Sequence, residues 1–436
     1  MPTPEPFVTT RTQIAGQSVA ELARRFGTPV YVYDAAKIVE RIKDLKQFDV
    51  IRYAQKACSN IAILNLARQH GVVVDAVSAG EIHRALAAGY KAGDSPLTTP
   101  DSPRHAEIVY TADIFDRESL DTVVKLNIPV NCGSPEMIDQ LGERSPGRNI
   151  TLRINPGFGH GHSQKTNTGG EQSKHGIWHE QLDDCLQRAD RHGLSVAGLH
   201  MHIGSGTDLA HLAQVCGAME KAALTVGRTI TTISAGGGLP TPYRAGQGYV
   251  DLNQYFQLWD AARKRLEQKF DHPVSLEIEP GRYLVAESGY LIAEIRAVKR
   301  MGGNTFYLLD AGFNNLARPI LYGAYHPMSV CPADGAAERH GGRSLQEVVV
   351  GGPLCESGDI FTQEEGGFVA RRSLPAAAVG DYLVIERAGA YGAVMASNYN
   401  SKPFAPEVLI QAGQPHLIRA RQSLDDLIRG EAIPVK

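Results

Sequence analysis

Lys56 follows a short apolar segment and is placed to carry covalent chemistry. The segment VIRYA occupies residues 50–54, and Gln55 and Lys56 come directly after it. A lysine at the end of a buried strand can form a Schiff base with an aldehyde. A single lysine in such a place is more often a solvated surface residue. The prediction for Lys56 therefore depends on the polar residues that end the other strands.

Three later apolar segments end in glycine-rich turns. These turns are HMHIGSG (200–206), AGGG (235–238) and EPGR (279–282). Glycine lets backbone N–H groups approach an anion, and Ser205 and Arg282 add a hydroxyl and a guanidinium. The other residues of this set are Gly236, Gly237, Gly238, Pro280 and Gly281. One such turn is a weak indication, but three successive turns predict a phosphate-binding site.

His200 and His202 are separated by one residue, so both side chains can face the same side of a strand. Two hydrogen-bonded core histidines are one interpretation. A metal-binding pair is another, but no third ligand is evident, and no metal site is predicted.

Eight apolar segments alternate with stretches of helical character. The segments are VIRYA (50–54), VVVDAV (72–77), IVYTA (108–112), IPVNC (128–132), ITLRIN (150–155), VAGLHMHI (196–203), TTISAG (231–236) and VSLEIE (274–279). The helical stretches are 59–70, 80–89, 116–126, 178–192, 209–227 and 251–270. This alternation indicates parallel βαβ units, and eight of them are typical of a (β/α)8 barrel of the TIM type. An open doubly wound sheet is the alternative, but no GxGxxG turn follows an early strand.

The pattern changes after about residue 285, where strand-like segments follow one another with few helices. These segments are YLIAEIRAVKRM, NTFYLLDAG, EVVVGGP, GDYLVIERAG, PEVLIQAG and HLIRAR. The early strand TPVYVYD (28–34) either joins them or leads into the barrel. We predict a barrel over 35–285 and a β-rich domain, sandwich-like or barrel-like, over 1–34 and 286–436.

Composition excludes several classes of protein. The 436 residues are 43% apolar and 21% charged with a net charge of -3, so no basic face for nucleic acid is expected. No apolar run is long enough to predict a membrane span, and the amino terminus lacks a secretory signal. The cysteines contain no CxxC pair, so we expect neither disulfides nor zinc, and a cytoplasmic location. They are Cys58, Cys132, Cys185, Cys216, Cys331 and Cys355.

Nine motifs together resemble a known family. They are VIRYAQKACSN, VDAVSAGEI, LRINPGFGHGHSQKTNTGG, SKHGI, HMHIGSG, AGGG, EIEPGR, GGPLCESGD and GAYGAVMASNYN. They resemble the alanine-racemase-like (fold type III) pyridoxal-phosphate enzymes and, within that class, the bacterial diaminopimelate decarboxylase family. The resemblance covers about residues 20 to 425. It implies pyridoxal 5'-phosphate as cofactor and a head-to-tail homodimer whose β-rich domains help to form two shared active sites.

The resemblance assigns roles to the residues at the barrel's strand ends. Lys56 carries the cofactor as a Schiff base. Glu279 keeps the pyridine nitrogen protonated, so that the ring accepts the electron pair left by CO2. His202 stacks on the ring, while His200 lies behind it. Asp75 belongs to the cofactor site. Glu81 supports Lys56, and Arg153 is expected to pair with one of these two acids.

Residues of the β-rich domain complete the site by resemblance. Cys355 gives a proton to the substrate carbon, since a thiol titrates near ~8.5. Arg318 and Tyr322 bind the distal carboxylate of the substrate, and Glu356 accepts from its distal ammonium. Tyr391 contacts phosphate and substrate, and Arg282 also serves both. A buried structural cysteine, a surface arginine and a domain aromatic are the alternatives for Cys355, Arg318 and Tyr391.

The implied reaction is decarboxylation of meso-2,6-diaminopimelate at its D-centre to L-lysine, the last step of lysine biosynthesis. A sister decarboxylase acting on arginine, ornithine or carboxynorspermidine is the main alternative. A racemase of this class would carry a tyrosine where Cys355 stands, and a pyridoxal-phosphate homeostasis protein would lack the β-rich domain. The stretch 156–176 resembles a mobile loop over the site, and 331–343 is a surface insert of unknown effect.

Overall fold

Eight parallel strands form a closed ring in the first part of the chain. The strands are β4 (Val50–Ala54), β5 (Val73–Ala76), β6 (Ile108–Ala112), β7 (Val130–Cys132), β8 (Asn149–Asn155), β10 (Ser195–His200), β11 (Thr232–Ser234) and β12 (Ser275–Ile278). Neighbours pair in chain order, β10 pairs with β8, and β12 pairs with β4 to close the ring. The predicted TIM-type barrel is confirmed. The short strand β9 (Ile177–Trp178) extends β8.

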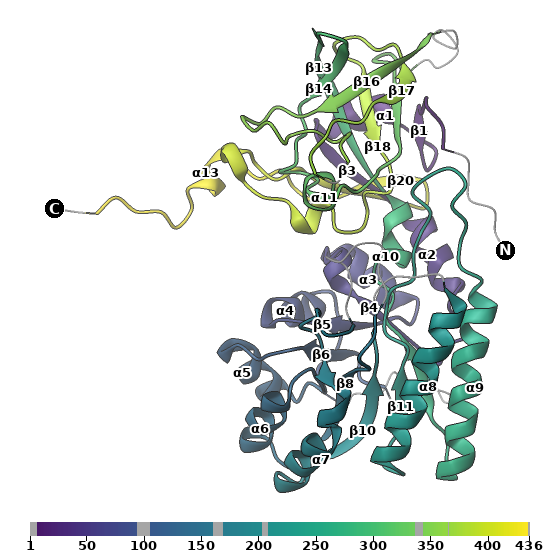
Figure 1. Cartoon of the computed structure of the whole chain (residues 1–436). Coiled ribbons are helices and arrows are strands. Elements are labelled where there is room, and N and C mark those ends of the chain that lie inside the picture. Colours follow the sequence, from purple (N-terminus) through teal and green to yellow (C-terminus); the bar gives the residue numbers. More distant parts are fainter. Residues whose placement is uncertain are drawn as a thin grey trace. The chain divides into compact units, whose positions relative to one another are not determined.

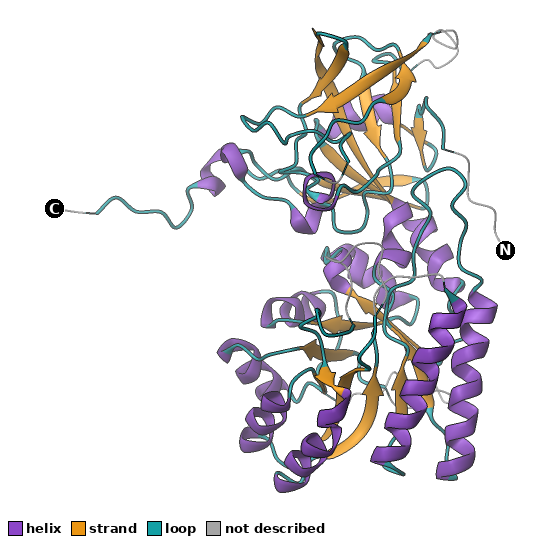
Figure 2. Cartoon of the chain, viewed as in Figure 1, coloured by secondary structure: helices purple, strands orange, loops and turns teal. Residues whose placement is uncertain are grey.

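One helix precedes the first of these strands, others follow most of them, and all lie outside the ring (Figure 2). They are α2 (Ala35–Lys43), α3 (Ile61–Gln69), α4 (Ala79–Ala87), α5 (Arg117–Leu126), α6 (Pro135–Arg144), α7 (Leu182–Arg191), α8 (Leu209–Val226) and α9 (Leu252–Phe270). Side-chain caps begin several of them, as at Asn60, Ser78 and Asp116. The helix α6 was not predicted, although Pro135 at its first turn is a common helix start.

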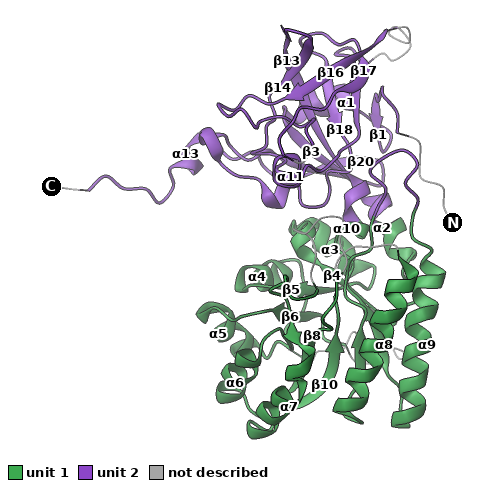
Figure 3. Cartoon of the chain, in the orientation of Figure 1, with its two compact units in different colours: residues 1, 39–240, 249–284 green, residues 2–38, 241–248, 285–436 purple. Residues whose placement is uncertain are grey.

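The structure, a computed structural model, describes residues 7–93, 105–159, 169–202, 208–335, 343–364 and 366–434. Contacts divide the chain into two units (Figure 3). The barrel unit comprises Val39–Pro240 and Tyr249–Leu284. The second unit comprises Pro2–Ile38, Thr241–Gly248 and Val285–Lys436. Part of the connection between β11 and α9, residues Thr241–Gly248, therefore belongs to the second unit.

The second unit is built mainly from one large sheet (Figure 1). Its strands are β3 (Val30–Asp34), β13 (Gly289–Met301), β14 (Asn304–Leu309), β15 (Met328–Cys331), β16 (Leu345–Gly351), β17 (Arg372–Pro375), β18 (Tyr382–Ile385), β19 (Glu407–Gln411) and β20 (Gln414–Arg419). The order is β17-β16-β14-β13-β3-β19-β20, with β18 pairing both β13 and β15. A second, mostly β domain is therefore confirmed.

The early strand TPVYVYD lies in this second sheet as β3. It pairs antiparallel with β13 and parallel with β19. Val30 and Val32 belong to a buried cluster with Leu22 and Val384, while Tyr31 on the opposite face is also fully buried. Because both faces are covered, Val30 to Tyr33 are all buried rather than alternating between buried and exposed.

Short elements complete the second unit and the connections. They are β1 (Gln13–Ile14), β2 (Gln17–Ser18), α1 (Val19–Phe26), α10 (Arg282–Val285), α11 (Arg318–Tyr322), α13 (Leu424–Leu427), and the 3₁₀ turns η1 (Gln55–Ala57), η3 (His179–Gln181), η4 (Ala286–Ser288), η5 (Ala393–Met395) and η6 (Tyr399–Ser401). Within the described ranges, no helix combines the length and the apolar character that crossing a membrane requires.

Candidate active site

Lys56 projects from the carboxyl end of β4. It sits in the middle of η1, where Gln55 and Ala57 are fully buried and Lys56 is exposed. Gln55 Nε2 donates to the carbonyl oxygen of Asp75 at 3.2 Å, which ties this turn to the end of the neighbouring strand β5. The buried residues on each side fix the backbone, so the lysine amine is presented at the barrel end.

Glu279 follows β12 and is held by two hydrogen bonds inside the barrel. Its Oε2 lies 2.8 Å from His200 Nε2, and its Oε1 accepts from Ser234 Oγ at 2.8 Å. Burial works to raise the pKa of Glu279, but His200, Ser234 and the charge of Arg52 outweigh it and lower the pKa to about 2. Glu279 is therefore a carboxylate over the whole range in which proteins function.

Asp75, at the end of β5, has the opposite electrostatics. Burial raises its pKa to about 7, and the neighbouring Glu279 carboxylate adds to the rise. The charge of Lys56 acts in the other direction. Asp75 Oδ1 is buried without a hydrogen-bond partner among the described residues. Two buried carboxyls thus lie close together, one firmly ionised and one that gains or loses a proton near neutral pH.

His202 follows β10 and is fixed by a backbone donor. The N–H of Gly237 donates to His202 Nδ1 at 2.8 Å, so the ring proton resides on Nε2. Burial lowers the pKa of His202 well below its ordinary value, and the charges of Arg153 and Lys56 lower it further. The imidazole is therefore neutral. Its ring is nearly parallel to that of His200, with centroids 6.5 Å apart.

The glycines after β11 are required by close approach of the strand ends. A Cβ on Gly236 would lie 2.5 Å from the Met201 carbonyl oxygen, and one on Gly237 would lie 2.5 Å from that of Glu279. Gly236 also has a φ of +63°. The ends of β10, β11 and β12 therefore meet at a backbone-lined surface that only glycine permits.

Other members of the predicted phosphate site are partly placed. Gly238 has a φ of +95°, and Arg282 begins α10 directly after Gly281. The carbonyl oxygen of Pro280 accepts from the N–H of Ala54 at 3.1 Å, which joins the EPGR turn to β4. Ser205 lies outside the described residues.

The prediction for Arg153 was wrong in its partner. Arg153 Nη1 lies 3.8 Å from Asp113 Oδ1 rather than beside Asp75 or Glu81. Asp113 follows β6, and Gly133 after β7 leaves room for it, since a Cβ there would lie 2.6 Å from Asp113 Oδ1. Glu81 instead accepts from the N–H of Val77 at 2.8 Å, close to the turn that begins α4.

The described parts of the 156–176 stretch are tied to the barrel. Asn155 Oδ1 accepts from the N–H groups of Gly157 and Gly170 at 3.1 and 3.0 Å. His175 Nδ1 lies 2.6 Å from Asp113 Oδ2. Both ends of the stretch are thus fixed at β8 and β6, while 160–168 lie outside the described residues.

In the second unit, Arg318 is buried and oriented by its neighbours. His326 Nδ1 lies 3.0 Å from the Glu386 carbonyl oxygen, so this nitrogen carries the proton. His326 Nε2 then accepts from Arg318 Nη1 at 2.8 Å. The guanidinium also lies over the ring of Tyr243, with Cζ 5.0 Å from the centroid. A fully buried, neutral histidine therefore fixes one edge of the arginine fork.

The remaining predicted residues of this unit are more open. Cys355, Glu356 and Tyr322 are exposed, and Cys355 is the one exposed thiol of the six. The N–H of Cys355 donates to Asn400 Oδ1 at 2.8 Å. Tyr391 is half-buried and has a φ of +56°, which is uncommon for a residue with a side chain.

One buried carboxylate organises the turn that presents Cys355. Asp359 Oδ2 accepts from the N–H of Leu354 at 2.8 Å, and its Oδ1 accepts from that of Phe313 at 2.7 Å. Burial raises the pKa of Asp359. The turn is therefore shaped by a carboxyl group four residues after the predicted proton donor Cys355.

Sequence reasoning missed Ser234, His326 and Asp359. Ser234 is the last residue of β11 (Thr232–Ser234), and Asp359 ends the CESGD segment whose first two residues were predicted. His326 lies eight residues after Arg318, in the same segment, with no helical or strand spacing to connect them. Only the polar residue types gave a signal.

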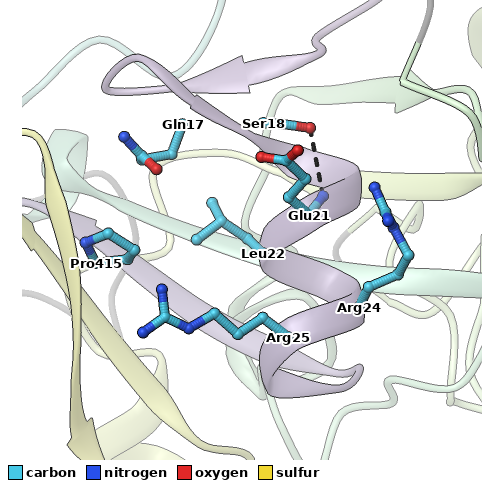
Figure 4. Close-up of a pocket in the computed structure, with 7 residues that line it drawn as sticks. All are labelled: Gln17, Ser18, Glu21, Leu22, Arg24, Arg25 and Pro415. Carbon is cyan, nitrogen blue, oxygen red and sulfur yellow. Dashed lines mark hydrogen bonds between the residues drawn. The ribbon is translucent and has the colours of Figure 1, made fainter.

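A surface pocket lies elsewhere on the second unit, along α1 (Figure 4). It is lined by Gln17, Ser18, Glu21, Leu22, Arg24, Arg25 and Pro415. Ser18 caps the helix by accepting from the N–H of Glu21, and Arg24 Nε donates to the Ala20 carbonyl oxygen. None of the predicted site residues lines this pocket.

Comparison with known proteins decides the family. A model of the pyridoxal-dependent decarboxylase, pyridoxal binding domain, matches residues 35–286. Diaminopimelate decarboxylase of Escherichia coli K12 is 55% identical over 430 residues, which cover 99% of this chain and 100% of that protein. The chain belongs to the diaminopimelate decarboxylase family. The Streptomyces coelicolor member is also 55% identical, over 96% of this chain and 92% of that protein.

Solved structures of the family agree with the fold. A crystal structure of diaminopimelate decarboxylase superposes with a TM-score of 0.90 and 55% identity, covering 97% of this chain and 99% of that one. The Helicobacter pylori diaminopimelate decarboxylase complexed with L-lysine gives a TM-score of 0.81 at 30% identity, covering 94% of this chain and 98% of that one.

The barrel end fits the pyridoxal phosphate of the family. An exposed amine at Lys56 suits an aldehyde, and the glycines at 236–238 carry no side chain that would keep a phosphate away from the strand ends. The buried Asp75 Oδ1 without a hydrogen-bond partner among the described residues and the ionised Glu279 suit a protonated heterocycle. This family member is a pyridoxal-phosphate enzyme, and its own residues are consistent with that chemistry.

Proposed function

We propose that the chain decarboxylates meso-2,6-diaminopimelate at its D-centre, releasing CO2 and L-lysine. Its similarity to the diaminopimelate decarboxylase of E. coli carries this proposal, at 55% identity over 99% of the chain. The relative from H. pylori, crystallised with L-lysine, supports the same reaction. The family name thus gives the reaction, and the residues of the two units suggest how it is performed.

Residues of the barrel bind and polarise the cofactor. Pyridoxal phosphate supplies an electron-accepting ring that stabilises the electron pair left on the substrate carbon as CO2 departs. Lys56 tethers the cofactor through its amine, and the Glu279 carboxylate retains a proton on the pyridine nitrogen because its own pKa is so low. The neutral ring of His202 offers a flat surface. The glycines of 236–238, Ser205, Arg282 and Tyr391 bind the phosphate.

Residues of the second unit bind and protonate the substrate. The Cys355 thiol donates a proton to the carbon that loses the carboxylate, which balances the reaction. Glu356 accepts from the distal ammonium. Arg318 binds the distal carboxylate with Tyr322, while Arg282 and Tyr391 also contact substrate. His326 accepts from Arg318 Nη1 and so fixes the orientation of the guanidinium that would bind the carboxylate.

The same arginine supports diaminopimelate over basic amino acids. Arginine and ornithine lack the distal carboxylate, so their binding would leave the buried Arg318 without its anion. By analogy with broken charge pairs this costs roughly 2–5 kcal/mol. We further propose a homodimer in which Cys355 and Glu356, both exposed within their own unit, serve the partner copy's barrel. The six free thiols suggest the cytoplasm.

A substrate panel tests the proposal. Purified protein loaded with cofactor is incubated with meso-diaminopimelate, arginine, ornithine or carboxynorspermidine, and released CO2 and L-lysine are measured. We expect CO2 and L-lysine in equal amounts from diaminopimelate, at least ten times faster than CO2 from any other substrate. The Lys56→Ala variant serves as the inactive control. Faster turnover of another amino acid would replace diaminopimelate as the substrate.

A further inference from the structure

Two arginines of the second unit share one aromatic ring. The Cζ atom of Arg372, at the start of β17, lies 4.0 Å from the centroid of Tyr325, and that of Arg244 lies 4.2 Å from it. Arg244 comes from the Thr241–Gly248 segment, far from Arg372 in the sequence. The fold therefore brings two positive charges to the same phenol ring.

Neither guanidinium has a carboxylate partner among the described residues. Elsewhere arginines are neutralised: Arg52 contacts Glu277 at 3.0 Å, Arg188 contacts Asp184 at 2.7 Å and Arg263 contacts Asp49 at 3.1 Å.

Arg372 is the less solvated of the two charges. Its Nε is buried and has no hydrogen-bond partner within the part of the chain that the structure describes, and its pKa is lowered by burial and by the charge of Arg244. The charge of Glu364 raises the pKa of Arg372, but Glu364 makes no ion pair with it among the described residues and is itself exposed. The ring attracts both cations, but it cannot use their N–H donors.

We propose that Arg244, Tyr325 and Arg372 form a binding site for a small oxyanion, either a carboxylate or a phosphate- or sulfate-type group. Guanidinium forks recognise such groups by paired N–H donors, and Tyr325 holds the two forks in place. A bound oxyanion relieves the repulsion between the two cations. None of these three residues has a role in the proposed decarboxylation.

The site adjoins the proposed carboxylate-binding group through two pairs of consecutive residues. Tyr243 lies under Arg318 and edge-on to His326, with ring centroids 5.5 Å apart. The next residue, Arg244, instead contacts Tyr325, the residue before His326. Neighbouring side chains thus serve two separate guanidinium groups, and the oxyanion site stands independently of the substrate assigned to Arg318.

The test measures oxyanion binding to the cofactor-loaded protein. Thermal unfolding midpoints are recorded in sodium sulfate, sodium phosphate, sodium succinate and, as reference, sodium chloride at equal ionic strength. A specific site adds a saturable rise in midpoint to the general effect of each salt. We expect Arg372→Met and Arg244→Met to weaken the saturable sulfate affinity at least tenfold. The phosphate and succinate arms identify which oxyanion binds more tightly.

Arg371→Met is the matched control. Arg371 is adjacent to Arg372 in the sequence and carries the same charge. It is exposed, and its Nε donates to Asn304 Oδ1 at 2.9 Å. This variant should keep the wild-type sulfate response. In chloride, Arg372→Met should unfold no earlier than wild type, because a repulsion is removed. If Arg372→Met does not fold, the exposed Arg244→Met gives the same test. Equal sulfate affinity in wild type and either site variant would overturn the proposal, as would an equal loss in the control.

Discussion

The barrel end and the loops of the second unit differ in how far they are prepared for chemistry. In the barrel, Glu279 and His202 each have a defined hydrogen-bond partner, and the pKa of each is moved far from its ordinary value. In the second unit, Cys355 and Glu356 are exposed. Arg318 is the exception there, since it is buried and held by His326. The electrostatics of the proposed cofactor site are thus built into the barrel unit, while Cys355 and Glu356 lie at exposed positions of the second unit.

Glu279→Gln tests the barrel end and should have the largest effect on turnover. An amide cannot retain the proton on the pyridine nitrogen, and His200 loses its anionic partner. We expect kcat to fall on the order of 10²–10⁴-fold. Steady-state CO2 release measures this, with Glu220→Gln as a control that removes a surface carboxylate paired to Arg265. A Glu279→Gln enzyme within tenfold of wild type would remove the role assigned to this carboxylate.

Cys355→Ala tests the open half. Without the thiol the substrate carbon must take its proton from water, so kcat should fall about 10²-fold. KM should change little, because Cys355 is not assigned to substrate binding. Comparison of kcat and KM for diaminopimelate decides this. A Cys355→Ala enzyme in which only KM changed would contradict this role, since the thiol would then be a binding residue rather than a proton donor.

Arg318→Met and His326→Leu examine the buried exception. Loss of the guanidinium should weaken kcat/KM for diaminopimelate by roughly 2–5 kcal/mol. His326→Leu keeps the arginine but removes the hydrogen bond to its Nη1. We expect kcat/KM for diaminopimelate to weaken by about 1–2 kcal/mol, mainly through KM. A rise in KM that is larger for Arg318→Met than for His326→Leu would support the positioning of Arg318 by His326. A His326→Leu enzyme with unchanged KM would show that the arginine needs no such support.

Asp75→Asn is tested by stability rather than by turnover, because its expected effect on stability depends on pH. The pKa of Asp75 is raised from 3.8 to about 7 in the folded protein, so the fold favours the protonated acid. Stability should therefore decline by up to about 1.4 kcal/mol per pH unit between these values. Urea unfolding of the cofactor-free protein at several pH values measures this. Asp75→Asn should be more stable relative to wild type at pH 8 than at pH 4, and a constant difference would contradict the shift.

The sequence allowed the barrel to be predicted because its strands are short apolar runs that end in polar turns. The helix α6 was missed because its sequence PEMIDQLGER contains Pro135 and Gly142, residue types that usually indicate a turn. Strand ends also located Lys56 and Glu279. The hydrogen-bond partners of Glu279 and Arg318 could not be predicted. Ser234 contacts Glu279, and His326 contacts Arg318, only in the folded chain. The error for Arg153 has the same origin, because the order of strands in the ring, rather than sequence distance, brings Asp113 beside it.

The attachment point of the cofactor is the most direct test of the account. The protein is loaded with pyridoxal phosphate, reduced with borohydride, digested and mapped by mass spectrometry. A single pyridoxyl adduct on Lys56, absent from Lys56→Ala, is the predicted result. An adduct on a different lysine of the intact protein, or none at all, would contradict the central claim.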